Sequence, residues 1–169
     1  MAPAAAQIQK DGIYTVEERR RRDDTIWTTV QGVLAPVQFL VFLFSIVLIA
    51  HYFISGEGLL AANISIVIKT LTLYAIMITG SIWEKVVFGR YLFARAFFWE
   101  DVFSIVVLAL HTAYLVALWT GALAAEPLLI LALLAYAAYV INAGQFLWKL
   151  RLARKQGALT APPEAEAPA

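Results

Sequence analysis

Cysteine is absent from this chain of 169 residues, and histidine occurs only twice, as His51 and His111. Without cysteine the chain can form no disulfide, thiolate zinc site, iron–sulfur cluster or thiol nucleophile. No ExxH pattern is present, which excludes the carboxylate di-iron site that depends on it. The GxGxxG, GxxxxGK and GxSxG patterns are also missing, and with them the usual signals of nucleotide binding and serine hydrolysis. We therefore expect no cofactor and no metal of the protein's own.

Charged residues are scarce, at 15% of the chain, and the net charge is only +1. Nothing in this balance indicates nucleic acid, so we expect no such partner. Hydrophobic residues make up 62% of the chain, against roughly 45–50% in a soluble domain. Mean hydropathy is +0.75. These values indicate a membrane protein whose surroundings are a lipid bilayer.

Four long apolar stretches are present, and a membrane-spanning helix needs about 20 mostly apolar residues. They cover about residues 31–54, 59–83, 98–119 and 127–148. Trp83, Trp119 and Trp148 close three of them, as expected for anchors at a membrane interface. Short loops make neighbouring spans antiparallel. The sequence therefore predicts an all-α polytopic membrane protein with four transmembrane helices in an up-down bundle.

The two ends of the chain differ from this membrane region. We expect one four-span domain over residues 15–156, a disordered leader over residues 1–14 and a disordered tail over residues 157–169, because both ends have little to bury. The leader lacks the apolar segment of a signal peptide. Thr15 and Glu18 fit a T-x-x-E capping box, which predicts a short basic surface helix on the N-terminal side. Its four arginines would face anionic head groups or simply fix the topology.

Two ionisable residues lie inside the predicted spans, where each costs roughly 2.5–3.5 kcal/mol on insertion scales. Lys69 and His111 are each about nine residues from the outer end of their span, so antiparallel packing predicts a similar depth for them. Both are candidates for substrate binding. Alternatively, Lys69 extends outward along its stem and His111 bonds a neighbouring helix.

Polar residues also gather at the inner ends of the spans. Glu84 ends the second span, whereas Glu100 and Asp101 begin the third, and Asn142 and Gln145 of the fourth fall near the same depth. Crowded carboxyl groups at a low-dielectric boundary can hold a proton donor beside an acceptor. The alternative is that the acidic pair merely favours a helix N-terminus and that Glu84 pairs with a nearby arginine. For the layer as a whole we favour a catalytic site.

Aromatic residues are concentrated beside this layer. Seven of the chain's twenty-two aromatic side chains fall within the sixteen residues from Phe88 to Phe103. An interfacial belt explains some of them. Their density also suits a wall for a large flat ligand, with Phe98 and Trp99 as candidate contacts.

Several segments are long and uncommon: WEKVVFG at residues 83–89, AFFWEDVFS at 96–104, ALHTAYLVAL at 109–118, NAGQFLWKLR at 142–151 and TIWTTVQGVLAPVQFLVF at 25–42. They resemble the 3-vinyl bacteriochlorophyllide hydratase family, in older naming 2-vinyl bacteriochlorophyllide hydratase. The resemblance covers roughly residues 25–154. It implies a hydro-lyase that adds water to the C3 vinyl group of a chlorophyllide, giving the 3-(1-hydroxyethyl) product in bacteriochlorophyll a biosynthesis. It also implies a magnesium-carrying chlorophyllide or bacteriochlorophyllide as substrate.

The assignment of roles rests on the residues themselves. Hydration of a vinyl group needs an acid, a base and a negative environment for a cation, which the carboxylates Glu100, Asp101 and Glu84 can supply, with Glu100 as the acid. The expected substrate contacts are His111, Lys69, Trp99, Phe98, Asn142 and Gln145. Among these, His111 is the candidate ligand of the substrate magnesium.

The competing interpretation is a non-catalytic pigment- or haem-binding membrane subunit. His51 and His111 could each bind haem iron. They differ in depth by roughly 9 Å at about 1.5 Å per residue, which is awkward for two ligands of one haem. Other pigment-biosynthesis enzymes and a second copy of the chain are the candidate protein partners.

The distribution of basic residues predicts the orientation. Twelve of the thirteen Lys and Arg residues lie before the first span, between the second and third, or after the fourth. The positive-inside rule then places both termini in the cytoplasm, in a multi-pass protein of a bacterial inner or intracytoplasmic membrane. Reporter fusions at each terminus test this prediction. A reporter active only in the cytoplasm should work at both ends, and periplasmic activity at either end would contradict the orientation.

Overall fold

The computed structural model describes residues 13–160, with side chains described for residues 13–155. Over this range the secondary structure consists of one short helix followed by four long ones. They are α2 (Val16–Asp24), α3 (Ile26–Ser55), α4 (Leu59–Phe88), α5 (Phe98–Thr120) and α6 (Ala125–Thr160). Each of the four long helices is sufficiently long and apolar to cross a membrane. The predicted all-α fold with four spans is therefore confirmed.

The helices extend beyond the apolar stretches of the sequence. Helices α3 and α4 are each 30 residues long, which corresponds to about 45 Å, whereas the hydrocarbon core of a bilayer is about 30 Å thick. Capping residues mark the ends of these helices. Thr25 caps the start of α3 with its side chain, and Gly56 and Gly89, with φ values of 76° and 81°, end α3 and α4. Apolar composition marks the membrane crossing, and the caps set the helix ends.

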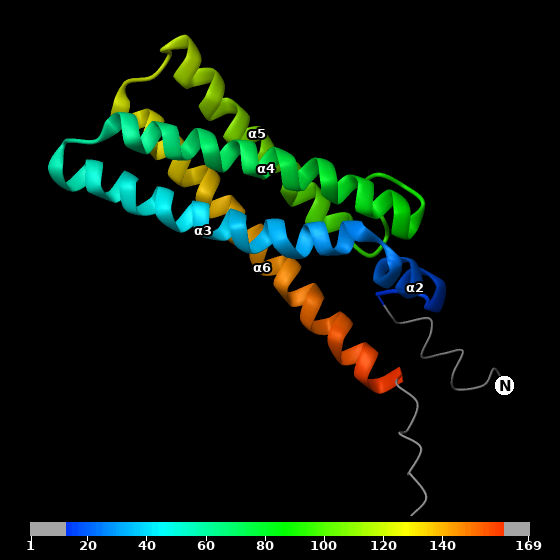
Figure 1. Ribbon diagram of the computed structural model, residues 1–169. Coiled ribbons are helices and arrows are strands. Elements are labelled where there is room, and N and C mark those ends of the chain that lie inside the picture. Colours follow the sequence, from blue (N-terminus) through cyan, green and yellow to red (C-terminus); the bar gives the residue numbers. More distant parts are fainter. Residues whose placement is uncertain (1–12, 161–169) are drawn as a thin grey trace, which may run out of the picture.

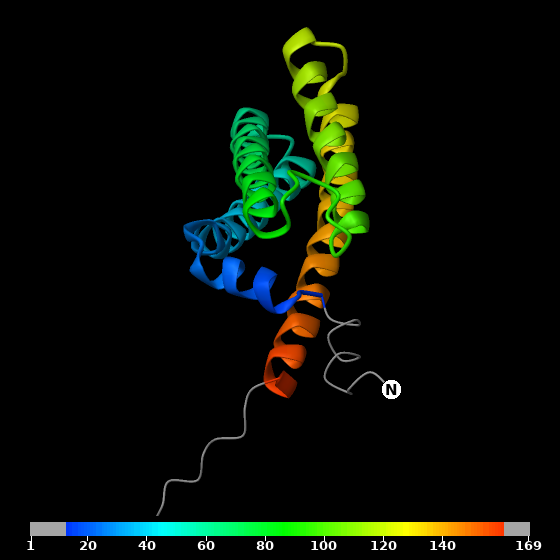
Figure 2. The ribbon, with the colours of Figure 1, turned by 90° about the vertical axis from the view of Figure 1, so that its right-hand side faces the viewer.

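The four spans form two antiparallel hairpins. Short loops join α3 to α4 and α5 to α6, and these pairs share the closest packing in the molecule. The two hairpins cross each other, as the views in Figures 1 and 2 show. Helix α6 continues beyond the other spans. We call the end of the bundle that carries α2, the loop at residues 89–97 and the C-terminal part of α6 the basic end.

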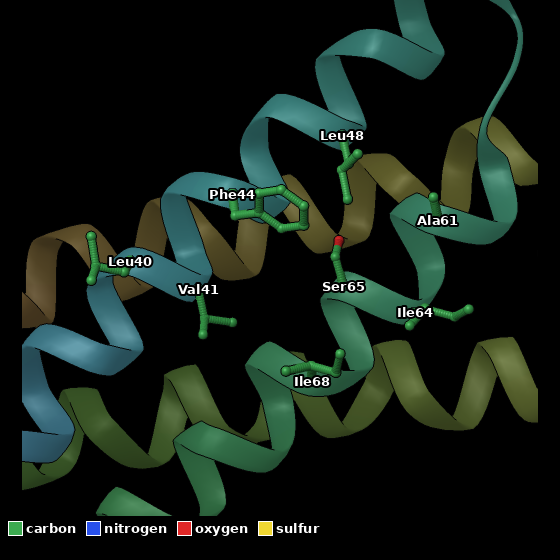
Figure 3. Close-up of a pocket in the computed structure, with 8 residues that line it drawn as sticks. All are labelled: Leu40, Val41, Phe44, Leu48, Ala61, Ile64, Ser65 and Ile68. Atoms are coloured by element: carbon green, nitrogen blue, oxygen red, sulfur yellow. The ribbon is translucent and has the colours of Figure 1, made fainter.

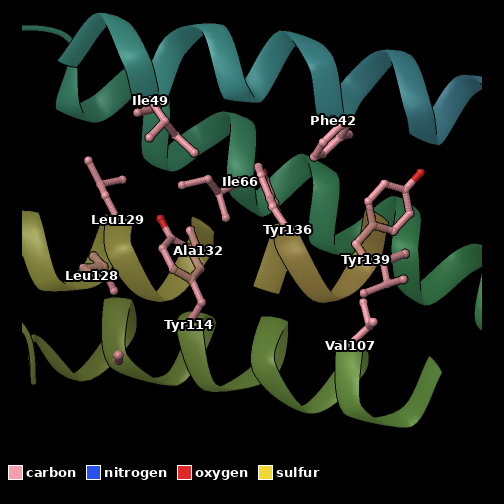
Figure 4. Close-up of a cluster of buried hydrophobic side chains, with 13 residues drawn as sticks. Phe42, Ile49, Ile66, Val107, Tyr114, Leu128, Leu129, Ala132, Tyr136 and Tyr139 are labelled. Atoms are coloured by element: carbon pink, nitrogen blue, oxygen red, sulfur yellow. The ribbon is translucent and has the colours of Figure 1, made fainter. Parts of the chain in front are cut away.

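The main apolar core lies where the hairpins meet, and all four spans contribute to it. Its members include Phe42 and Ile49 of α3, Ile66 of α4, Tyr114 of α5 and Tyr136 of α6 (Figure 4). Tyr136 also joins a buried polar group, because its hydroxyl lies 2.6 Å from the Ser45 hydroxyl. Ser45 lies in turn 2.8 Å from the Ser65 hydroxyl of α4. The core therefore contains satisfied hydroxyl groups in the middle of the bundle, where unpaired ones would be costly.

The short basic helix is confirmed as α2, and its capping box is present. The Thr15 hydroxyl accepts from the Glu18 N–H at 3.2 Å, and the Glu18 carboxylate accepts from the Thr15 N–H at 2.8 Å. Two of its arginines pair with acidic residues on the same helix: Arg20 with Asp24, and Arg22 with Asp23. These pairs leave the surface of α2 only partly basic.

Two expected boundaries differ from the structure. Ile13 and Tyr14 were assigned to the disordered leader, but Tyr14 is buried and stacks on Phe88 with ring centroids 5.7 Å apart. Its aromatic ring supplies apolar area that the residues before it lack. Helix α6 continues to Thr160, past the expected start of the tail at residue 157, and the first prolines that follow its first turn, Pro162 and Pro163, lie beyond this end. The remainder of the leader and of the tail lies outside the described residues.

Tyr14 belongs to a second apolar cluster, which closes the basic end. Buried Val87 and Phe97 form the cluster with it, and Phe146 of α6 packs against them. The Arg22 guanidinium lies 4.9 Å from the centroid of the Tyr14 ring. Tyr14 therefore fastens the start of α2 to the ends of the spanning helices.

This arrangement predicts a pH-dependent docking of α2. Burial raises the pKa of the Tyr14 phenol to about 12, against the opposing effect of Arg22. The docked phenol holds its proton more tightly than an exposed one. Docking is therefore fully stabilised below pH 10 and weakens as the pH rises from about 10 to about 12.

The absence of cysteine makes this measurable. Two cysteines introduced at exposed Arg21 and Arg151 can carry spin labels for a distance measurement between α2 and α6. The distance distribution should be narrow at pH 9 and broad near pH 12. In a Tyr14→Phe background it should stay narrow throughout. An unchanged distribution at pH 12 in the unsubstituted background would contradict the role of the phenol.

Candidate active site

The three predicted carboxylates converge at the basic end of the bundle. Glu84 comes from the end of α4, and Glu100 and Asp101 from the first turn of α5. Each is buried, with 6% or less of its surface exposed. The loop at residues 89–97 reverses the chain over a short distance, so that the end of α4 lies beside the start of α5. We call these three residues with Asn142 and Gln145 the inner layer.

Glu84 and Asp101 hold the loop that connects their helices. The Phe93 N–H donates to Asp101 Oδ2 at 2.7 Å, and the Ala94 N–H donates to Glu84 Oε2 at 3.2 Å. Phe93 has a φ of 60°, a left-handed conformation that is uncommon for a residue other than glycine. The bond to Asp101 helps to compensate for that strain. These two carboxylates therefore have a structural role.

The same two side chains also meet each other. The carboxyl groups of Glu84 and Asp101 interact with each other across the α4–α5 junction. A hydrogen bond between two carboxyl groups needs a proton on one of them, because an ionised carboxylate can only accept. The pair can therefore store one proton in addition to holding the loop.

Glu100 has different surroundings. Its Oε1 lies 3.5 Å from Lys149 Nζ, and Lys149 also donates to the Ala96 carbonyl. Its Oε2 is buried, and no described residue gives it a hydrogen bond. One oxygen of Glu100 is thus held by a cation from α6, and the other remains available to accept a proton or a hydrogen bond.

Helix α6 adds amide oxygens beside Glu100. Asn142 Nδ2 donates to the Ser104 hydroxyl at 2.8 Å, while its Oδ1 has no donor among the described residues. The buried side-chain oxygens of Gln145 and, on α3, of Gln38 also have no donor among the described residues. Buried acceptors in proteins are usually satisfied by a donor, often water. The inner layer therefore offers several acceptors to a small donor such as a water molecule.

Lys69 and His111 form a second polar group near the middle of the bundle, and both are fully buried. The Lys69 ammonium lies 3.8 Å from the centroid of the Tyr139 ring. His111 Nδ1 lies 2.8 Å from the Val107 carbonyl, so this nitrogen carries the proton and Nε2 keeps its lone pair. The two residues interact electrostatically, in agreement with the similar depth expected from the sequence.

The two polar groups lie at different levels. Glu100 and His111 are eleven residues apart on α5, which corresponds to about 16 Å along the helix at 1.5 Å per residue. They share a face of α5, as the spacing predicted. Between these levels lie buried Ser104, which accepts from Asn142, and buried Tyr139, whose ring contacts Lys69.

Comparisons with known proteins agree on one family. The 2-vinyl bacteriochlorophyllide hydratase (BCHF) family matches residues 14–152. The chain is 64% identical over 152 residues to a 2-vinyl bacteriochlorophyllide hydratase of Rhodobacter capsulatus, covering 88% of this chain and 86% of that protein. It is 62% identical over 157 residues to a protein of the same name from Cereibacter sphaeroides, covering 91% and 96%.

The chain belongs to the 2-vinyl bacteriochlorophyllide hydratase family. The resemblance inferred from the sequence is thereby confirmed. The family match includes every residue of the inner layer as well as Lys69 and His111. No solved structure matches the chain.

The structure does not bring Phe98 and Trp99 to the inner layer of this family member. Phe98 is 45% exposed and Trp99 is 66% exposed, and they contact each other on the outer surface of α5. Glu100 and Asp101 occupy the inward face of the same helical turn, and Phe98 and Trp99 therefore face outward. Their proposed contact with a ligand could occur only at the surface of the bundle.

An apolar groove lies away from the inner layer. It has a volume of about 560 Å³ and is lined by apolar side chains of α3 and α4, including Leu40, Phe44 and Ile68 (Figure 3). Ser65 is the one polar residue that lines it, and its hydroxyl is already bonded to Ser45. A groove without acids or bases suits lipid chains better than catalysis. We therefore place the candidate active site at the inner layer.

Sequence reasoning missed Lys149 as a member of the site. The residue was counted only among the charges that set the topology. Asn142, Gln145 and Lys149 follow a spacing of three and then four residues, which places them on one face of a helix. That periodicity indicates that Lys149 lies on the same side of its helix as the two amides. In the same way, Ser104 lies four residues after Glu100 and so on the same face of its helix.

Proposed function

We propose that this chain is a hydratase that adds water to the C3 vinyl group of a chlorophyllide or bacteriochlorophyllide in bacteriochlorophyll biosynthesis. Both relatives are named for that activity, and their alignments cover 88% and 91% of this chain. The observation that carries the proposal is the inner layer itself. It combines a carboxyl pair that can hold a proton with a separate carboxylate that has a free acceptor oxygen.

The reaction needs only proton transfers and water. A proton adds to the terminal vinyl carbon, which breaks the π bond and leaves a positive charge on the adjacent carbon, delocalised into the macrocycle. The oxygen of water then bonds to that carbon and gives up a proton to a base. The sum is the addition of one water molecule without oxidation or reduction. An acid, a base and nearby negative charge are sufficient for it.

We assign the acid to the Glu84–Asp101 pair and the base to Glu100. A carboxylate held by the Lys149 ammonium is better suited to accept a proton than to donate one. The carboxyl pair, by contrast, can hold a proton between its members. From the sequence alone Glu100 was expected to be the acid, because its pairing with Lys149 was not foreseen.

The neighbouring amide oxygens would position the water. Asn142 Oδ1, Gln145 Oε1 and Glu100 Oε2 are buried acceptors without a described donor. A water molecule that donates to two of them would present its lone pair to the developing cation. Proton abstraction by Glu100 would then complete the addition. The proton returns to the acid through the adjacent side chains of Glu100 and Asp101.

The substrate would reach this layer from the membrane. A chlorophyllide is flat and amphipathic, so it partitions to the interface between lipid and water. Phe98 and Trp99 offer it exposed rings at the basic end. The contact between the two hairpins is sparser than the packing within each hairpin.

We also propose that the basic end faces the cytoplasm of a photosynthetic bacterium. Its three basic segments would then contact the anionic surface of the inner leaflet. The substrate would be met there by the exposed aromatic rings. Partner enzymes of the same pathway, or a second copy of the chain, could pass the pigment across that surface.

His111 remains a candidate ligand of the substrate magnesium. Its buried Nε2 keeps a lone pair and has no donor among the described residues. A ring held there cannot present its vinyl group to Glu100, because about 16 Å separates the two levels. His111 would therefore hold the pigment in another position, before or after the reaction.

The prediction for His111 concerns binding rather than turnover. His111→Ala should weaken binding of the magnesium pigment more than binding of its metal-free analogue, because only the former can use the lone pair. Absorbance titrations of the purified protein with the two pigments measure both affinities. Equal losses for the two would assign His111 to packing.

Glu100→Gln is the sharpest test of the mechanism, because it keeps the shape of the side chain and removes the base. Turnover of 3-vinyl chlorophyllide, followed by pigment chromatography, should fall by about 10²- to 10⁴-fold while binding persists. Glu126→Gln makes the same change at an exposed position at the start of α6 and should retain normal turnover. Near-normal turnover in Glu100→Gln, Glu84→Gln and Asp101→Asn at equal protein levels would show that the inner layer is structural.

A further inference from the structure

Lys69 is a buried cation without a counter-ion. It lies in the apolar part of α4, none of its surface is exposed, and its ammonium group has no hydrogen-bond partner in the described part of the chain. The ion pairs found among the described residues lie elsewhere, on α2 and between Glu100 and Lys149. The nearest favourable contact is the face of the Tyr139 ring.

This environment does not satisfy an ammonium group. A cation over an aromatic ring gains part of the stabilisation that it loses on leaving water, but its three donors stay unused. His111, the neighbouring polar group, is held by Val107 and supplies no negative charge. The sequence left open that the Lys69 side chain extends to the surface. It does not, because it is buried against Tyr139. An anion beside Lys69 would satisfy both its charge and its donors.

We propose that Lys69 binds the carboxylate of the pigment, the free propionate that distinguishes a chlorophyllide from an esterified chlorophyll. This inference rests on the proposed function and specifies how the substrate is held. A carboxylate would supply both the missing charge and acceptors for the ammonium donors. In an apolar interior such a pair has little competition from water.

The position of Lys69 fits the length of this substrate. The Lys69 ammonium lies at the level of Tyr139, and Lys149, which pairs with Glu100, follows ten residues later on α6. That separation is about 15 Å along the helix. On a chlorin the vinyl and propionate groups project from neighbouring five-membered rings in diverging directions. A ring anchored through its carboxylate at Lys69 would therefore extend its vinyl group toward the inner layer.

Tyr139 would hold the ammonium in place for this contact. Its ring is part of the core and also packs against Phe42, with ring centroids 5.2 Å apart. The aromatic face therefore cannot turn away freely. Lys69 would keep one side against Tyr139 and direct its donors to the carboxylate.

The experiment compares binding of two pigments, 3-vinyl chlorophyllide and its methyl ester. Affinities are measured by absorbance titration of the purified full chain in one detergent. Wild type should prefer the free acid by roughly ten- to a hundredfold, the range expected for a charge-assisted hydrogen bond. Lys69→Met should remove the preference by weakening acid binding alone, whereas Lys69→Arg should retain much of it.

Lys85→Met is the matched control. It removes the same charge from the same helix at an exposed position whose ammonium donates to the Gly89 carbonyl. It should leave the preference for the free acid unchanged. Differences in how the two pigments enter detergent affect all variants alike, so they cancel when the acid-to-ester ratio of one variant is compared with that of another.

A preference for the acid that survives in Lys69→Met would overturn the inference, as would its absence in wild type. If Lys69→Met does not accumulate, Lys69→Gln provides the neutral variant, and the wild-type ratio alone can still refute the proposal. Measuring both binding and turnover distinguishes the proposed role of Lys69 from the proposed hydratase function. Vinyl hydration by wild type without acid preference would refute the role of Lys69 only. Acid-selective binding without hydration would refute the proposed function only.

Discussion

Charged and polar side chains inside an apolar bundle need partners, and this constraint organises the molecule. Water cannot satisfy them in the hydrocarbon region, so each must meet another protein group or a ligand. Lys149 therefore reaches Glu100 across the α5–α6 hairpin, and Asn142 donates to Ser104 one turn farther into the membrane. These contacts set the register of α5 against α6. The groups that they leave without partners mark where a ligand would bind.

The same constraint explains the connection between the hairpins. The backbone of the loop at residues 89–97 would expose unpaired N–H groups at the membrane boundary. Asp101 and Glu84 accept two of them, and the left-handed conformation of Phe93 turns the chain so that both bonds can form. Below them Tyr14 and its aromatic neighbours close the bundle. The inner layer is thereby held between a packed core on one side and an aromatic cluster on the other.

The residues to which we assign a chemical role also have a structural one. Glu84 and Asp101 hold the loop, yet their contact with each other is also the arrangement in which carboxyl groups share a proton. Glu100 is paired on one oxygen and free on the other. A site built in this way needs little rearrangement of its polar groups during a reaction, because the helices already hold them in place. Movement would be needed mainly to admit the substrate.

The sequence by itself determined the spans, the short basic helix and the depth of the polar residues. Apolar composition decides which segments can enter a membrane, and helical periodicity decides which residues share a face, so both can be read locally. Even within this local information, Lys149 was overlooked, although its spacing from Asn142 and Gln145 was visible.

Only the tertiary structure decided how these elements meet. The crossing of the two hairpins, the burial of Tyr14 and the outward position of Trp99 depend on contacts between residues distant in the chain. The same is true of the pairing of Lys149 with Glu100, on which we base the proposed role of Glu100 as the base. Residue type fixes which partners a side chain requires, but the packing of α4, α5 and α6 determines which partner it obtains, and among the described residues Lys69 obtains none with a negative charge.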